Sequence, residues 1–414
     1  MEATILLEEQ YRPKNEEAVF DFKISDENLE KTTEGIVLPT GYKSKKVTKN
    51  HTLRGSNFET IEDLVENYGG RRSNIKSINK PENLMEPIIC ALIQNEKIIF
   101  KRELSRGKHG SAILSEVEGL KKNIEYVVKV PHSKTIPKCT TKRVVYTRND
   151  NQGTTIFPEG SYSCNEELSE FIISLFVGDL SKSKQSINFL ETYYFAICND
   201  KKYMFMEKAD STLGAEFGHF SIEDVNSVYI QLLHSLALIQ KKYSIVHGDL
   251  HLDNVFLKMD EKKCRSYKYG DKTVYAPYCN FIAYIGDWGR AVKYSEPCAG
   301  NSDILKGLYG DLCPNFFSSA YDIIVLTNSF QHMLRKNNMK SAFIKKIANW
   351  INSNIQNIAP EEVYYFKKDQ NTGRPNPTAL SNYFSHVSPL NILQNNDLMG
   401  KYMKGKSCIF GGEF

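Results

Sequence analysis

The stretch from Ser221 to Leu257 constrains the fold of this chain more than any other. Apolar residues recur at helical spacing after Ser221, and Asp224 stands three residues on, as in a capping box. This pattern predicts a long helix that begins near Ser221. A polar octapeptide follows, from His247 to Asn254, and then the apolar run Val255-Phe256-Leu257. The order therefore predicts a helix, a polar loop and a strand.

The polar loop and the next strand carry residue types that suit phosphoryl transfer. Asp249 is followed five residues later by Asn254. The carboxylate can accept the proton of an incoming hydroxyl, and the amide oxygen can bind Mg²⁺. A second strand-like run ends in Ile285-Gly286-Asp287-Trp288-Gly289 and can place Asp287 opposite Asn254. Magnesium prefers such oxygen ligands and bridges them to phosphate oxygens.

The rest of the chain predicts an α+β protein. The first 85 residues are polar, and they are interpreted as an extension with one short helix at 58–68. Short β-rich runs, separated by turns, predict an antiparallel sheet between about 87 and 130. The further predictions are a polar linker at 133–163, a helix at 166–180, strands at 193–197 and 203–207, helices at 318–356, and a tail of weak periodicity at 359–414. The predicted domains are 1–85, 86–208 and 209–414.

Composition limits the classes of partner. Hydrophobic residues make up 41% of the chain and charged residues 25%, as in an ordinary soluble globular protein. Basic and acidic residues nearly balance, 53 against 49, which leaves a net charge of +4. So small a charge does not argue for nucleic acid or a membrane as the main partner. No apolar stretch approaches the roughly 20 residues that a membrane-spanning helix needs. The first residues lack the basic region of a signal peptide, so a soluble, intracellular protein is expected.

The chain has nine cysteines, scattered without a C-x-x-C pair. An odd and dispersed set is typical of free thiols in a reducing compartment. We therefore expect neither a disulfide framework nor a zinc site.

The motifs around Asp249 and Asp287 resemble the catalytic loop and the metal-binding D-F-G motif of protein kinases. They are similar also to the H-G-D-x-x-x-x-N and D-W motifs of aminoglycoside and choline kinases. The resemblance covers residues 95 to 390, and it implies a bilobal protein-kinase-like fold with a small antiparallel β lobe and a larger helical lobe. It further implies ATP and Mg²⁺ as cofactors, Asp249 as a catalytic residue, and Asn254 and Asp287 as metal ligands that also hold the nucleotide.

The segment from Leu104 to Ala112 looks like a degenerate glycine-rich loop. Gly107 and Gly110 match the second and third glycines of that loop, and Ser105 stands at the first. Lys129, in the run Val-Val-Lys-Val, matches the phosphate-binding lysine of kinases. The resemblance thus assigns these four residues to nucleotide binding, and Lys129 also to catalysis.

Three further positions are carried over from the same resemblance. A glutamate of the helix at 166–180 should pair with Lys129. Glu170 fits the apolar spacing best, and Glu167, one turn earlier, is the alternative. Glu207, after Met204-Phe205-Met206, resembles the hinge that holds adenine through backbone hydrogen bonds. Asp322 resembles the aspartate that ties down the backbone of the catalytic loop.

The sequence also departs from the kinase pattern. Gly248 replaces the usual Arg before the catalytic Asp, Trp288 replaces Phe, and no A-P-E stands between Asp287 and Asp322. The insert at 259–282 looks like one found in kinases of poxviruses and other large DNA viruses. It therefore favours a viral serine/threonine protein kinase that acts on a protein substrate, in the host cytoplasm or in the virion.

Two alternatives remain open. A small-molecule kinase of the aminoglycoside or choline type is favoured by His247-Gly248-Asp249 and by Asp287-Trp288. A catalytically inactive scaffold is the other alternative, against which the complete set of Lys129, Asp249, Asn254 and Asp287 argues. The sequence carries no signal for a particular substrate or oligomeric state.

Overall fold

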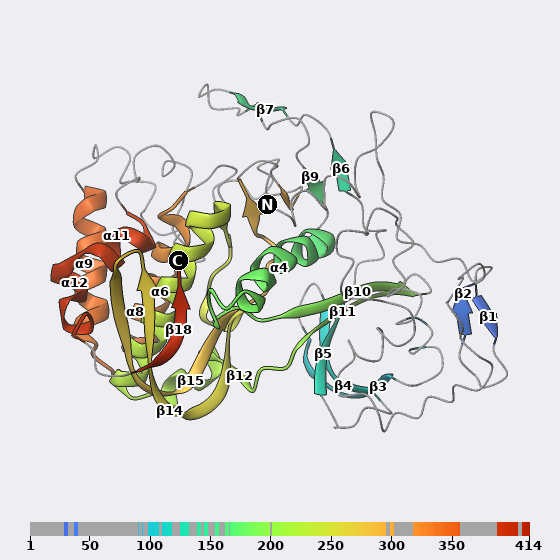
Figure 1. Cartoon of the computed structure of the whole chain (residues 1–414), viewed down its shortest axis with the longest axis horizontal. Helices are drawn as coiled ribbons and strands as arrows, with labels where there is room; N and C mark the ends of the chain where they lie inside the picture. Colours follow the sequence, from blue (N-terminus) through green and yellow to red (C-terminus); the bar gives the residue numbers. More distant parts are fainter. Residues whose placement is uncertain are drawn as a thin grey trace. The chain divides into compact units, whose positions relative to one another are not determined.

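The computed structural model shows a mixed α+β protein with antiparallel sheets, in agreement with the predicted class (Figure 1). The residues that it describes are 29–31, 37–39, 90, 93, 98–106, 110–117, 125–131, 139–141, 145–147, 154–156, 162–164, 166–198, 201–294, 299–301, 318–356, 387–404 and 408–414.

The chain forms two compact units. Unit 1 comprises Met1–Thr140 and Thr192–Lys208, and unit 2 comprises Thr141–Glu191 and Ala209–Phe414. The chain enters unit 2 for the last time after Lys208, where the sequence predicted a domain boundary. Residues 141–191 were predicted in the small domain but belong to unit 2. There the helix α4 (Glu166–Lys182) packs against the short strands β16 (Val292–Lys293) and β17 (Ala299–Asn301).

Unit 1 contains a five-stranded antiparallel sheet. Its strands are β3 (Ile98–Arg106), β4 (Gly110–Val117), β5 (Glu125–Pro131), β10 (Thr192–Cys198) and β11 (Lys201–Glu207). They lie in the order β10-β11-β5-β4-β3, so β5 is central and β3 is an edge strand. The central strands bury Val128 and Phe205 completely, whereas β3 is exposed after Ile98. All five strands were predicted, because each alternates or concentrates apolar residues in a short run. Unit 1 also contains the hairpin β1 (Leu29–Lys31) and β2 (Val37–Pro39).

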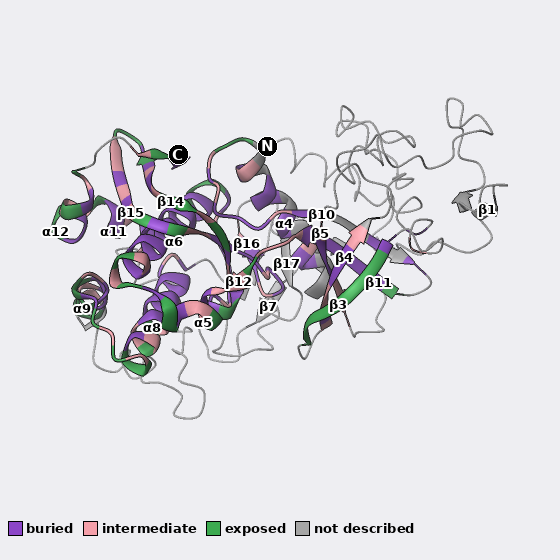
Figure 2. Ribbon diagram, turned by 90° about the horizontal axis from the view of Figure 1, so that it is seen from below, coloured by how far each residue is buried: buried purple, intermediate pink, exposed green. Residues whose placement is uncertain are grey.

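Unit 2 contains one long buried helix, α6 (Ile222–Tyr243). Among its described residues, the other helices are α4, α5 (Leu213–Glu216), α8 (Tyr321–Lys336), α9 (Ala342–Gln356), α11 (Pro389–Gln394) and α12 (Asn396–Met399), with 3-10 turns η4 (Phe217–His219), η5 (Leu252–Asn254) and η8 (Gly400–Tyr402). Figure 2 shows α6 mostly in the purple of buried residues. Both α8 and α11 pack against it.

The N-terminus of α6 confirms the predicted capping box. Ser221 Oγ accepts the N–H of Asp224, and the Asp224 carboxylate accepts the N–H of Ser221, both at 3.1 Å. Such a cap stabilises a helix by about 1 kcal/mol, because it satisfies N–H groups that the helix leaves unpaired. The helix ends where Ser244 adopts a left-handed conformation (φ 50°) and donates its N–H to the Gln240 carbonyl.

A long hairpin follows the polar loop. It consists of β14 (Val255–Tyr269) and β15 (Lys272–Ile285), paired from Val255–Ile285 outward to the turn at Gly270. The predicted insert at 259–282 forms the outer part of this hairpin. The strand β15 packs against α6, and the short strand β12 (Ser211–Thr212) joins β14.

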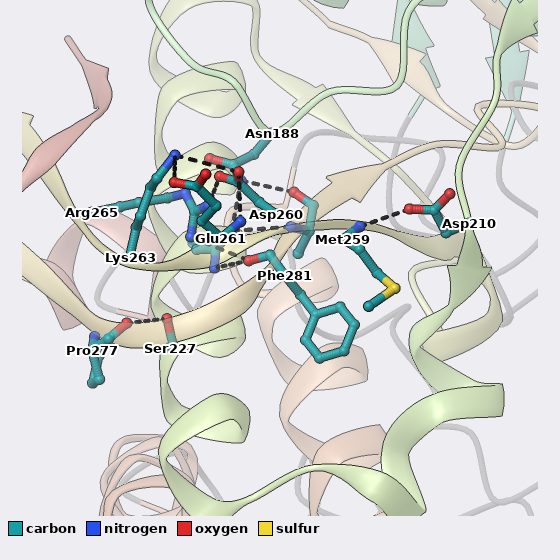
Figure 3. A network of polar contacts seen from close by, with 12 residues as sticks. Asn188, Asp210, Ser227, Met259, Asp260, Glu261, Lys263, Arg265, Pro277 and Phe281 are labelled. Atoms are coloured by element: carbon teal, nitrogen blue, oxygen red, sulfur yellow. Dashed lines mark hydrogen bonds and ion pairs between the residues drawn. The ribbon is translucent and has the colours of Figure 1, made fainter.

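Polar side chains cross-link the insert internally and join it to α6 (Figure 3). The fully buried Arg265 pairs with Asp260 at 2.6 Å and donates to the carbonyl oxygen of Phe281. Partial burial opposes ionisation of Asp260, but the N–H of Glu261 and the guanidinium of Arg265 outweigh it and lower the pKa of this carboxyl. Ser227 of α6 donates to the carbonyl oxygen of Pro277, so the helix also fixes β15.

The C-terminal strand β18 (Ile409–Glu413) pairs in parallel with β14. A disulfide joins Cys264 to Cys408, with their Cα atoms 5.2 Å apart, and another joins Cys90 to Cys198 of unit 1 at 5.3 Å. The prediction of free thiols is therefore wrong for these four cysteines, whereas Cys279 is free and buried. Each bridge spans more than a hundred residues, so the local spacing of cysteines could not indicate it.

The tail also contains more regular structure than its weak periodicity predicted.

The predicted linker at 133–163 contains short strands instead of irregular chain alone. They are β6 (Cys139–Thr141), β7 (Val145–Thr147), β8 (Thr154–Ile156) and β9 (Tyr162–Cys164). In unit 2, β9 pairs with β17, β17 with β16, and β16 with β13 (Ile245–Val246). Strands of two or three residues are too short to show an alternating pattern in the sequence.

Within the part of the chain that the structure describes, every helix is too short or too polar to span a membrane. The predicted helix at 58–68 lies outside the described residues, and so does the rest of the 1–85 extension apart from β1 and β2.

Candidate active site

The polar loop of residues 247–254 connects two anchored elements of unit 2. Before it, β13 is buried and pairs with β16. After it, η5 leads directly into β14, and the N–H of Asn254 bonds to the carbonyl oxygen of His251. Both ends of the loop are therefore fixed by the core.

Asp322, on the first turn of α8, holds the start of the loop. Its two carboxylate oxygens accept the N–H groups of His247 at 2.8 Å and Gly248 at 3.1 Å. The side chain is completely buried, and this burial raises the pKa of the carboxyl, although His247 and the two N–H groups favour the ionised form. The prediction that Asp322 ties down the loop backbone is confirmed.

His247 links the loop to the second motif. Its Nε2 lies 2.9 Å from the carbonyl oxygen of Gly286, and its Nδ1 accepts the N–H of Asp249 at 3.3 Å. Because Nδ1 is an acceptor here, Nε2 carries the ring proton and donates to Gly286. The indole of Trp288 is buried against the imidazole, with 4.7 Å between ring centroids, and also contacts Phe189. The buried ring of His247 thus joins Asp249 to the strand end that carries Asp287.

Gly248 occupies a position that only glycine fits. Its φ is +79°, and an added Cβ would stand 2.6 Å from the carbonyl oxygen of Arg290. A larger residue would meet both backbone strain and a collision with backbone. This explains the departure from the kinase pattern at this position.

Asn254 and Asp287 are brought together by the base of the hairpin. The N–H of Gly286 donates to the carbonyl oxygen of Asn254 at 3.2 Å, and the next residue is Asp287. The side-chain nitrogen of Asn254 donates to the carbonyl oxygen of Asp249 at 2.8 Å. Its Oδ1, at the opposite end of the amide, is directed away from that bond. These two hydrogen bonds thereby link the backbone segments of the three predicted residues, Asp249, Asn254 and Asp287.

Asp287 has a left-handed backbone (φ 60°). A non-glycine residue there costs on the order of 1 kcal/mol, although Asp and Asn tolerate the region better than most. Such strain persists only where the surroundings impose it, and it concentrates at functional sites. Asp287 lies between the end of β15 and the buried Trp288.

Two cationic or ionisable side chains flank Asp249. Arg290 Nη1 lies 3.3 Å from Oδ1, and His251 Nε2 lies 3.9 Å from Oδ2. Sequence reasoning did not identify either contact. Arg290 stands only three residues after Asp287, but no local pattern shows which carboxylate it meets.

These oxygen donors fit a magnesium ion. Mg²⁺ is commonly held by one or two protein oxygens and takes its other ligands from water and phosphate. Asn254 Oδ1 and the Asp287 carboxylate supply that number. Among the described residues, no group of three or more His, Cys, Asp or Glu side chains could hold a metal ion.

Four of the residues predicted to bind the nucleotide, Ser105, Gly110, Lys129 and Glu207, lie on the sheet of unit 1. Lys129 is half-buried in β5, between Ala112 of β4 and Met204 of β11. Gly110 begins β4, and a Cβ there would stand 2.8 Å from the carbonyl oxygen of Val130. Ser105 is exposed near the end of β3, and Glu207 ends β11.

The structure does not test three of the predicted positions, Gly107, Glu170 and Glu167. Gly107 lies outside the described residues. Glu170 is buried in α4, on the same helix as Glu167. The helix belongs to unit 2 and Lys129 to unit 1, so the pairing of Lys129 with either glutamate stays a prediction.

No protein-family model matches this chain, and no significantly similar curated protein was found. The residues and their geometry are therefore the only basis for inferring a function.

Proposed function

We propose that this chain is an ATP- and Mg²⁺-dependent phosphotransferase with a bilobal protein-kinase-like fold, and that it phosphorylates serine or threonine hydroxyls of a protein. One observation carries the proposal. Asp249, Asn254 and Asp287 are connected by two short hydrogen-bonded links, Asn254 Nδ2 to Asp249 O and Gly286 N to Asn254 O. Phosphoryl transfer needs this combination of a carboxylate for the acceptor and oxygen ligands for a metal.

The roles follow from the chemistry of each group. Asp249 would orient the acceptor hydroxyl and accept its proton as the new oxygen–phosphorus bond forms. Asn254 and Asp287 would hold Mg²⁺, which when bound neutralises charge on the phosphate oxygens. Asp322 and His247 would keep the loop backbone in place, because both are buried and hydrogen-bonded to it. The nucleotide contacts of Lys129, Gly110 and Glu207 belong to the same proposal.

The order of elements supports the proposal as well. Strands β3 to β5 precede α4, β10 and β11 follow it, and the long helices α6, α8 and α9 come after the complete sheet. This is the order of a small β lobe followed by a larger helical lobe that the kinase resemblance implies.

A small-molecule kinase is the second candidate, and Gly248 favours it. The close approach of the Arg290 carbonyl excludes an arginine at position 248, so the H-G-D form of the motif is built into this backbone. The same form resembles the aminoglycoside and choline kinases. The acceptor therefore has to be decided by experiment.

The full-length chain should be incubated with labelled ATP, Mg²⁺ and three separate acceptors: casein, an aminoglycoside and choline. We expect the label on casein. Asp249→Asn should lower transfer by about 10²–10⁴-fold, the range typical of a lost general base. Asp253→Asn is the matched control, because Asp253 lies in the same loop with its side chain 74% exposed. Label on the small molecules instead would favour the second candidate, and nucleotide binding without any transfer would indicate a scaffold.

A further inference from the structure

The two carboxylate oxygens of Asp249 lie in different surroundings. Oδ1 is 3.3 Å from Nη1 of Arg290, and both side chains are only 20% exposed. Oδ2 is 3.9 Å from Nε2 of His251, whose side chain is 36% exposed. His251 Nδ1 accepts the N–H of Asp253, so Nε2 is the nitrogen that carries a proton towards Asp249. One oxygen therefore faces a guanidinium at ion-pair distance, and the other faces the more exposed side of the loop.

The backbone of Arg290 is held on both sides. Two residues earlier, Trp288 is buried against His247 and Phe189. The N–H of Ala291 donates to the carbonyl oxygen of Trp288 at 2.9 Å, and Val292 begins β16, which pairs with β13. The side chain of Arg290 is thus carried by a backbone turn that the core holds in place.

Gly248 completes this arrangement. Because it lacks a side chain, the Arg290 carbonyl can approach to within 2.6 Å of the point where a Cβ would stand. The residue before Asp249 and the residue whose side chain meets Asp249 are therefore packed against each other. An arginine also remains charged at any pH at which the protein is folded.

We propose that Arg290 is a positioning residue that holds Asp249 through Oδ1 and directs Oδ2 towards the acceptor hydroxyl. This inference rests on the proposed function. The hydroxyl then binds on the His251 side of the carboxylate. As the acceptor oxygen forms its bond to the γ-phosphorus, the proton passes to Oδ2 and the bond to the β-phosphate oxygen breaks, which releases ADP. Arg290 neither gives nor takes a proton.

A role in positioning differs from that of an ordinary surface ion pair, which contributes little to stability and nothing to turnover. Loss of the guanidinium should release the carboxylate from its reactive geometry. A misplacement of about 1 Å can cost on the order of 10²-fold in rate. Nucleotide affinity should change little, because Arg290 acts on the acceptor side.

The test compares wild type with Arg290→Ala, Arg290→Lys and, as a control, Arg335→Ala, an exposed residue near the end of α8. We expect kcat to fall by about 10- to 100-fold in Arg290→Ala, with the KM for ATP within about twofold of wild type. Arg290→Lys should recover part of the loss. Millimolar guanidinium should raise the rate of Arg290→Ala and leave wild type and Arg335→Ala unchanged.

A second readout does not depend on turnover. A double-mutant cycle of Asp249→Asn and Arg290→Ala provides it. The double variant should lose less in its thermal unfolding midpoint than the sum of the losses of the two single variants. Wild-type kcat in Arg290→Ala, additive midpoints, or a loss confined to the KM for ATP would overturn the inference and leave the proposed function standing. Absence of transfer by wild type, or full transfer by Asp249→Asn, would instead remove the proposed function and this role with it.

Discussion

The carbonyl oxygen of Arg290 lies 2.6 Å from the position that a Cβ on Gly248 would occupy. The backbone before Asp249 is thus packed directly against the turn after Asp287. One residue type satisfies both the close approach and the positive φ of 79°. The arginine of most protein kinases has no room here, so the difference from the kinase pattern is structural.

Gly248→Ala should destabilise the chain more than Gly270→Ala does. Both glycines have positive φ, and each alanine should lose about 1–2 kcal/mol to backbone strain. Gly270 has no heavy atom within 4 Å of the added Cβ, whereas Gly248 meets the Arg290 carbonyl, which should add about 1–3 kcal/mol. Urea denaturation of the two variants measures the difference. Equal losses of unfolding free energy in the two variants would show that the Arg290 carbonyl moves away from the added Cβ at no energetic cost.

Asp322→Asn should lower the free energy of unfolding by about 1–3 kcal/mol. An amide offers one acceptor oxygen, so the N–H of either His247 or Gly248 would face the amide hydrogens and stay unsatisfied in a buried site. Phosphate transfer should fall in the same variant, because the loop backbone shifts. Asp271→Asn, at the exposed turn of the hairpin, is the control and should change neither quantity. Unchanged stability of Asp322→Asn would mean that the two hydrogen bonds contribute nothing net.

Asp287→Asn should weaken the stabilisation of the chain by Mg-ATP. Asparagine tolerates the left-handed backbone at this position, so the variant removes the charge without adding strain. Ligand binding raises the thermal midpoint by an amount that depends on affinity, and loss of a metal ligand should bring the shift with Mg-ATP close to that with ATP alone. Thermal unfolding with and without Mg²⁺ measures this, with Asp253→Asn as the control. A full Mg²⁺-dependent shift in Asp287→Asn would place the metal elsewhere.

His234 should make the stability of unit 2 depend on pH. It is completely buried in α6 between the rings of Tyr267 and Phe414, and burial lowers its pKa to about 4 despite the hydrogen bond to Lys268 O. The unfolded chain takes up this proton near pH 6.5 and the folded chain does so only near pH 4. Stability is therefore full above pH 6.5 and falls as the pH decreases from 6.5 to 4. The loss amounts to about 3 kcal/mol.

The slope of stability against pH tests this, since the substitution itself also changes packing. His234→Gln can still donate to the Lys268 carbonyl but does not titrate, so its stability should vary less between pH 6.5 and 4 than that of wild type. His332→Gln, on the exposed face of α8, should keep the wild-type slope. An identical slope in wild type and His234→Gln would contradict the assignment.

Local signals in the sequence determined much of the secondary structure. The helix α6 begins at the predicted capping box of Ser221 and Asp224, and the five strands of unit 1 follow their apolar runs. The sequence also determined the spacing of Asp249 and Asn254, which lie in one loop. These features depend on residues within a few positions of one another, and hydrophobic periodicity and capping act over that distance.

Tertiary structure alone decided the contacts of Arg290 with Asp249 and of the C-terminal strand with β14. It also paired Cys264 with Cys408, against the expectation of free thiols. Each of these contacts joins residues that are distant in sequence, and each depends on strand register and on which faces the core buries. A side chain's chemistry can be inferred from its type, but its partner is set by the packing that brings the two segments together.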